Sequence, residues 1–203
     1  MAWCVGGRSA RPSPADVAER PLDRVHRVFV ASRPEELWIA DFTYAATWMG
    51  LVYVAFVIDV FARRIVGWRV SRSRQADLVL DALEQALHAH QVGKGLIHHS
   101  DRGVQYLSIR YSERLKDAGV QASVGTTGDS YDNAMAETII GLFKTEVIHA
   151  RGPWRSLDGV EYATLEWVDW FNNCRLLEPI GHVPPADFEA EYDRQQSGLA
   201  RAA

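Results

Sequence analysis

Three strand patterns in succession constrain the fold of this chain most strongly. Residues Leu37 to Tyr44 alternate between two faces that are both largely apolar, which is typical of a strand in the middle of a sheet. A continuous apolar run from Leu51 to Ala62 and a third run from Ile65 to Val70 follow after short turns. Such short connections predict an antiparallel meander, because parallel strands need a longer crossover.

Helix and strand patterns then alternate. A helix is predicted from Gln75 to about His90, followed by a strand from Leu96 to Asp101 that the crossover should make parallel. The later elements are a helix (109–118), a strand (121–124), a helix (132–148) and a last helix (158–173) that Asp158 and Glu161 would begin as a capping box. This order is that of the ribonuclease H-like fold, an α/β fold with a mixed five-stranded sheet flanked by helices and, here, an extra C-terminal helix.

The chain divides by composition into four predicted segments. Residues 1–36 are rich in Gly, Pro, Arg and Ser and predict a poorly ordered leader or linker. A core follows over 37–150, and a helical extension of that core over 151–190. Pro184 and Pro185 are expected to end the ordered part, and residues 191–203 to form a flexible tail.

Composition indicates an ordinary soluble domain. The 203 residues are 47% hydrophobic and 24% charged, and the formal net charge is −4. An acidic balance argues against a nucleic-acid binder, although metal ions held by an acidic cluster would offset that objection. Cys4 and Cys174 fit neither a zinc site nor a disulfide framework. Without a signal sequence or an apolar run of the ~20 residues that span a bilayer, the protein is predicted to be cytoplasmic, with no membrane partner.

Three acidic residues stand at places where a carboxylate needs an explanation. Asp41 lies in the first strand pattern, Asp101 ends the fourth, and Glu137 lies within the predicted helix 132–148. Each has an ordinary interpretation, since strand-end aspartates bond to backbone and helix glutamates are usually exposed. Together, acids delivered by strand, strand and helix are what a fold needs to hold two divalent metals over a phosphodiester.

Other polar residues rank lower as candidates. His98 and His99 should point to opposite faces of a strand, and at least one is expected to be structural. Asp59 is expected to form a turn-stabilising ion pair with Arg63 or Arg64. An arginine group is equally compatible with a phosphate-facing patch or a solvated edge; it consists of Arg63, Arg64, Arg69, Arg72 and Arg74. Trp167 and Trp170 are expected to pack the last helix.

Several linked motifs carry a family resemblance. They are Leu37-Trp38-Ile39-Ala40-Asp41-Phe42-Thr43-Tyr44, Ile58-Asp59-Val60-Phe61-Ala62-Arg63-Arg64-Ile65-Val66-Gly67-Trp68, His98-His99-Ser100-Asp101-Arg102-Gly103-Val104-Gln105-Tyr106, Asp132-Asn133-Ala134-Met135-Ala136-Glu137, Leu142-Phe143-Lys144-Thr145-Glu146, Trp170-Phe171-Asn172-Asn173 and Pro184-Pro185-Ala186-Asp187-Phe188-Glu189. On these residues, roughly Pro21 to Glu189, the chain resembles the insertion-sequence transposases of the retroviral-integrase type, which many bacterial elements encode as a second reading frame.

The resemblance implies a function and a site. It implies metal-dependent DNA cleavage and strand transfer, with Asp41, Asp101 and Glu137 as catalytic residues that bind two Mg²⁺ ions, for which Mn²⁺ can substitute. It also implies DNA contacts from Lys144, with Asn133 and Arg102 as further candidates. The implied partners are DNA, as element ends and target, a second copy of the chain on that DNA, and an upstream-frame DNA-binding protein. The implied location is the bacterial cytoplasm, at the nucleoid.

The N-terminus departs from the family pattern. Residues 1–20 match no part of the helical DNA-binding region that members carry upstream, so recognition of element ends is not expected of this chain alone. The departure leaves two alternatives open. One is a truncated, catalytically idle remnant that binds DNA or oligomerises, and the other is a ribonuclease H-type nuclease.

Overall fold

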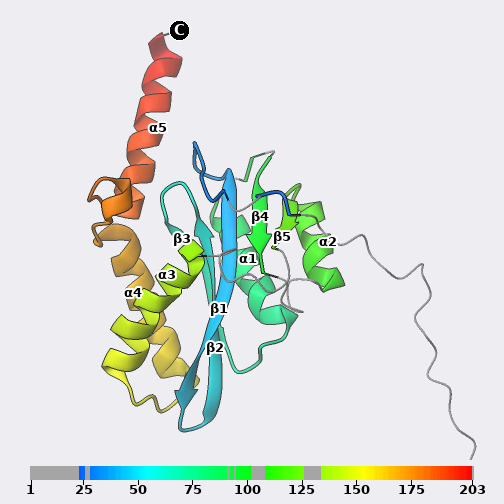
Figure 1. The fold of residues 1–203 in the computed structure, drawn as a ribbon, viewed down its shortest axis with the longest axis vertical. Helices are drawn as coiled ribbons and strands as arrows, with labels where there is room; N and C mark the ends of the chain where they lie inside the picture. Colours follow the sequence, from blue (N-terminus) through cyan, green and yellow to red (C-terminus); the bar gives the residue numbers. More distant parts are fainter. Residues whose placement is uncertain are drawn as a thin grey trace, which may run out of the picture.

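The computed structural model describes residues 23–25, 28–90, 92–93, 95–101, 108–125 and 134–202 (Figure 1). The strands are β1 (Leu37–Thr47), β2 (Gly50–Asp59), β3 (Ile65–Ser71), β4 (Ile97–Ser100) and β5 (Gln121–Val124). The helices are α1 (Ala76–Ala89), α2 (Ile109–Asp117), α3 (Ala134–Phe143), α4 (Leu157–Asn173) and α5 (Pro185–Ala202). A π-helical segment, η3 (Lys144–His149), extends α3, and a 3₁₀ turn, η4 (Glu178–Ile180), follows α4.

The five strands form one mixed sheet in the order β3-β2-β1-β4-β5. Strands β1, β2 and β3 pair antiparallel, whereas β4 pairs parallel with β1 and β5 parallel with β4. The predicted ribonuclease H-like arrangement is therefore confirmed, with β1 at the centre of the sheet. Strand β2 ends at Asp59, earlier than predicted, because the Asp59 carboxylate accepts hydrogen bonds from the next turn.

Helices cover both faces of the sheet and enclose two apolar cores (Figure 1). On one face, α1 and α2 pack over Trp38, Ala40 and Val57. Gly67 permits the close approach of α1, since a Cβ at this position would collide with the carbonyl oxygen of Ala82. On the other face, α3, η3 and α4 pack over Ile39 and Phe56. Along β1, odd-numbered side chains such as Ile39 therefore enter the core under α3 and α4, and even-numbered ones such as Trp38 enter the core under α1 and α2.

The prediction that Pro184 and Pro185 end the ordered part is wrong. Pro185 is instead the first residue of α5. Proline is common there, because the N–H that it lacks would have no partner within the helix. The aromatic ring of Phe61 contacts the rings of Phe188 and Tyr192, which attaches the start of α5 to the turn after β2. The helix continues to Ala202, which differs from the flexible tail predicted from residue 191 onward. The division into leader, core and extension stays a prediction.

Two helix ends differ from their sequence-based assignments. Helix α4 begins after Ser156, whose hydroxyl accepts a hydrogen bond from the Gly159 amide, so Asp158 and Glu161 do not form the predicted capping box. The helix predicted over 132–148 is described from Ala134, and changes to π-helical hydrogen bonding at Lys144. None of the described helices is long and apolar enough to cross a membrane.

Candidate active site

The register of the central strands brings Asp41 and Asp101 together. Ala40 of β1 pairs with Ser100 at the end of β4, so Asp41 and Asp101 are the next residues along two parallel neighbouring strands. Ile39 and His99 form the pair two positions earlier, and a strand side chain repeats its direction every second residue. Asp41 therefore lies on the sheet face that carries Ile39, and extended backbone would place Asp101 on that face too.

Helix α3 brings Glu137 to the same face. Its neighbours Ala136, Ile139 and Phe143 are buried in the core that contains Ile39, which fixes α3 against this side of the sheet. Glu137 lies off this apolar stripe and is exposed, as is Asp101, whereas Asp41 is partly buried. The three acids thus come from a central strand, the end of its parallel neighbour, and a helix packed above them.

The electrostatics of Asp41 reflect this arrangement. Burial raises the pKa of its carboxyl to about 7; a hydrogen bond of 2.7 Å from the Phe42 amide opposes the shift, and the charges of Asp101 and Glu137 add to it. Asp101 and Glu137 are therefore close enough to Asp41 for their charges to act on its carboxyl. Among the described residues, however, no group of three or more His, Cys, Asp or Glu side chains is arranged closely enough to hold a metal ion.

Lys144 extends the site along the helix. Its ammonium nitrogen lies 5.7 Å from the ring centroid of Tyr44, an exposed residue near the end of β1. The contact between Lys144 and Tyr44 could not be predicted from the sequence, because it depends on how α3 and η3 pack on β1. Two further predicted DNA contacts, Asn133 and Arg102, lie outside the described residues.

Glu146 belongs to a motif that carries the family resemblance, but its contacts could not be predicted from the sequence. Its carboxylate accepts a hydrogen bond of 2.8 Å from the indole nitrogen of Trp167 and pairs with Arg175 at 2.6 Å. These contacts tie η3, which begins at Lys144, to α4 and the loop beyond it. Trp167 is buried against Phe56 and Phe143, so its predicted packing role is confirmed, whereas Trp170 is 43% exposed and lies under the Arg175 guanidinium.

The two histidines of β4 are buried on opposite faces of the sheet, as predicted. His98 contacts Tyr111 of α2, with 3.1 Å between Nε2 and the phenol oxygen, and burial lowers its pKa to about 3. The Nδ1 atom of His99 lies 2.9 Å from the Ser123 hydroxyl on β5, and its ring meets the edge of Phe29. Both rings connect β4 to its neighbours, which is a structural role.

Asp59 has a structural role, but the predicted ion pair is wrong. One carboxylate oxygen accepts hydrogen bonds from the Glu35 amide and the Trp38 indole, and the other accepts from the amides of Phe61 and Ala62. Arg64 pairs instead with Glu189 of α5 at 3.0 Å. Burial raises the pKa of Asp59 to about 6, and the three backbone hydrogen bonds oppose this shift. Elsewhere in the arginine group, Arg69 pairs with Asp81 at 3.3 Å.

Comparison with known proteins agrees with this architecture. Residues 31–130 and 118–185 each match a family described as Integrase core domain. The chain is 58% identical over 95% of its length to the "Transposase for insertion sequence element IS629" of Shigella sonnei, and spans 64% of that protein. It is 54% identical over 94% of its length to the "Putative transposase for insertion sequence element IS986/IS6110" of Mycobacterium tuberculosis, and spans 70% of it.

Solved structures show the same fold at low sequence identity. The HTLV-2 integrase catalytic core domain, determined in complex with magnesium, superimposes with a TM-score of 0.62 at 15% identity, over 79% of this chain and 99% of that one. A chain of the simian T-cell lymphotropic virus intasome, determined with PP2A regulatory subunit B56 gamma, gives a TM-score of 0.66 at 12% identity, over 78% and 55% of the two chains.

Proposed function

Because the chain belongs to the insertion-sequence transposases that carry an integrase core domain, we propose that it catalyses metal-dependent DNA cleavage and strand transfer. The observation that carries this proposal is the site itself. Asp41 lies in β1 one residue after its last pair with β4, Asp101 directly follows β4, Glu137 comes from the helix above, and the charges of Asp101 and Glu137 act on Asp41. The substrates would be the ends of an insertion element and a target DNA.

The donor chemistry of the three acids fits a divalent cation. Carboxylate oxygens are the ligands that Mg²⁺ and Mn²⁺ prefer. Burial raises the pKa of Asp41, the charges of Asp101 and Glu137 add to this shift, and a bound cation would oppose it. Asp41, Asp101 and Glu137 would hold two such ions, and an inward movement of the exposed Asp101 and Glu137 would complete the ligand set. When bound, two such ions activate a hydroxyl or water as the nucleophile and stabilise the oxygen that leaves.

The residues of the chain itself would position the DNA. The partly buried Asp41 is fixed by the central strand, so it would provide the rigid side of the site. Lys144, held over the Tyr44 ring, would contact a phosphate of the DNA beside the acids, and Arg102 and Asn133 would add contacts. With Glu146 anchored to Trp167 and Arg175, the helical segment that carries Lys144 keeps a defined orientation.

The proposed partners follow from this chemistry. Two DNA ends must be joined to one target, so we expect two or more copies of the chain to act together on DNA, with an upstream-frame protein as a further partner. The proposed location is the cytoplasm, at the nucleoid, where the DNA substrate lies. Magnesium as the physiological ion is consistent with the HTLV-2 integrase core, which was determined in complex with it.

A strand-transfer assay tests the proposal. The purified chain is incubated with Mg²⁺ or Mn²⁺, a labelled duplex ending in the inverted repeat of its own element, and a plasmid target. Joined product should form and should be lost in Asp41→Asn and Glu137→Gln, while Asp193→Asn, which removes an exposed charge on α5, should retain it. Equal joining by all variants would refute the assigned acids. Cleavage of an RNA–DNA hybrid without joining would favour a ribonuclease H-type nuclease.

A further inference from the structure

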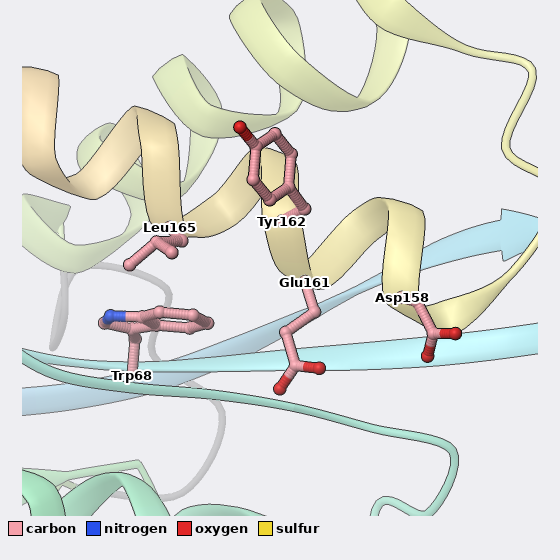
Figure 2. Close-up of a pocket in the computed structure, with 5 residues that line it drawn as sticks. All are labelled: Trp68, Asp158, Glu161, Tyr162 and Leu165. Carbon is pink, nitrogen blue, oxygen red and sulfur yellow. The ribbon is translucent and has the colours of Figure 1, made fainter.

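A hollow on the surface lies between β3 and the beginning of α4 (Figure 2). Its volume is about 340 Å³, and its lining consists of Trp68, Asp158, Glu161, Tyr162 and Leu165. Trp68 lies in the same cross-strand row as Asp41, but the fully buried Phe56 stands between them. The rings of Phe143 and Trp167 cover Phe56, so the hollow is separate from the acidic site.

Aromatic and apolar groups form the walls of this hollow. The Trp68 indole projects from β3 toward α4, and Leu165 lies on the helix side of the indole (Figure 2). The side chain of Tyr162 comes from the turn of α4 before Leu165. Tyr162 is 64% exposed and Leu165 is 51% exposed, so two large apolar side chains line the same hollow and remain open to solvent. An open aromatic surface of this kind binds planar or cationic groups through its ring faces.

Two carboxylates line the hollow, and Figure 2 shows that Glu161 is the one nearer the indole, with Asp158 beyond it. Asp158 and Glu161 are three residues apart on α4, and Figure 2 shows both pointing from the helix toward the strands. Glu161 is partly buried, yet neither acid forms an ion pair or an accepted side-chain hydrogen bond within the described ranges of the chain. Arg69 pairs with Asp81 on α1, and the Arg155 guanidinium lies over the Trp48 ring. Among the residues that the structure describes, those that line the hollow include two carboxylates and no cationic side chain.

We propose that this hollow binds the guanidinium group of an arginine presented by a partner protein. The planar guanidinium stacks on an indole and forms two parallel hydrogen bonds with a carboxylate, so it matches both parts of the lining. The ammonium of a lysine cannot form the parallel pair, and a phosphate would meet two carboxylates. Tyr162 and Leu165 form an exposed apolar rim, which the methylene groups of an arginine side chain would cover and so remove from water.

Binding of blocked amino acids to the full chain tests this inference. The probe is N-acetyl-arginine amide, which carries the side chain without terminal charges, and the signal is the Trp68 indole resonance in a ¹H–¹⁵N spectrum, assigned with Trp68→Phe. We expect saturable shifts with a Kd on the order of 1 mM, as for a single side chain. N-acetyl-lysine amide should bind at least about threefold more weakly, and the neutral isostere N-acetyl-citrulline amide should cause no saturable shift.

Variants show whether the lining causes the binding. Glu161→Gln and Asp158→Asn should each weaken binding of the arginine probe by about fivefold, and the double variant should abolish it. Asp193→Asn removes the same charge from an exposed position on α5 and should leave the Kd unchanged. Equal binding by Glu161→Gln, or equal shifts with the citrulline probe, would overturn the proposal. Tighter binding of free L-arginine than of the blocked form would overturn its assignment to a protein segment.

Discussion

Asp41 and Asp59 lie on neighbouring antiparallel strands, and they differ most in the number of hydrogen bonds that each carboxylate accepts. Each aspartate lies in an otherwise apolar strand, and burial raises the pKa of each, to about 7 for Asp41 and about 6 for Asp59. Asp59 accepts four hydrogen bonds from N–H groups. Asp41 accepts one, from the Phe42 amide, and has the charges of Asp101 and Glu137 nearby.

The difference distinguishes a carboxylate whose hydrogen bonds are supplied by the fold from one that we propose to be catalytic. The four donors around Asp59 replace the water that its carboxylate loses on burial, so it needs nothing further. Like charges lie near both residues, Asp101 and Glu137 near Asp41 and Glu189 near Asp59. Asp41, however, accepts a single opposing hydrogen bond. We therefore expect Asp41 to gain more from a bound cation. Burial and a raised pKa are common to both residues, and the number of hydrogen-bond donors is what distinguishes the roles that we propose for them.

Replacing Asp41 should produce the largest effect. In Asp41→Asn we expect strand transfer to fall by at least about 1,000-fold, or roughly 4 kcal/mol of transition-state stabilisation, because a neutral amide binds a divalent ion poorly. Its thermal stability should equal or exceed that of the wild type, since the substitution removes repulsion. Rates at matched concentrations of folded protein, with unfolding followed by circular dichroism, measure both. A variant that transfers strands at a tenth of the normal rate would contradict the comparison.

Replacing Asp59 should show the opposite pattern. Asp59→Ala leaves four N–H donors without their acceptor, so we expect the free energy of unfolding to fall by about 3 kcal/mol. In Asp59→Asn, which keeps one acceptor oxygen, the free energy of unfolding should fall by about half as much. Urea denaturation measures these values. Strand transfer per folded molecule should stay within a few-fold of normal, and its complete loss in a well-folded Asp59→Asn would assign Asp59 to the catalytic site.

The pH dependence of stability should show the raised pKa of Asp41. Because this pKa is raised in the folded state, protonation of Asp41 stabilises the fold below about pH 4, and this contribution disappears as pH rises to about 7. The free energy of unfolding of Asp41→Asn, relative to wild type, should therefore increase by roughly 3 kcal/mol over that range. Added Mg²⁺ at pH 8 should stabilise the wild type and not the variant. Denaturation curves at pH 5 and pH 8 provide the test.

Lys144 should give the smallest effect. In Lys144→Gln we expect DNA binding to weaken by about fivefold and the slope of log K against log salt to decrease in magnitude by about one, the result of losing one phosphate contact. The control is Lys116→Gln, an exposed lysine on α2, which should bind DNA normally. Fluorescence anisotropy across a salt series measures both. An unchanged salt slope in Lys144→Gln would place its ammonium away from the DNA.

The sequence was sufficient for the sheet, whereas the joint role of the three acids stays a prediction. Alternation along β1 and the order of strands and helices predicted the topology, because face periodicity is a local property of the residues. The register then brings Asp41 beside Asp101 without further information. Arg102 and Asn133 lie outside the described residues, so their roles stay predictions.

Other features depend on contacts that no local pattern contains. Helix α5 is ordered where Phe188 and Tyr192 meet Phe61, more than a hundred residues away in the sequence, whereas the local signal was a pair of prolines. The donors to Asp59 are mainly backbone amides, which every residue type except proline carries, so the sequence instead indicated the charged Arg63 and Arg64. The Lys144–Tyr44 contact likewise requires the packing of α3 on β1.

Metal binding tests the central claim most directly, because it requires neither DNA nor the activity of a complete transposase. Titration of Mn²⁺ into the purified chain, followed by the electron paramagnetic resonance signal of the free ion, reports the number and affinity of the sites. We predict binding by the wild type and by Asp59→Asn, and its loss in Asp41→Asn. Equal Mn²⁺ binding by Asp41→Asn and wild type would contradict the assignment of the three acids as a metal site.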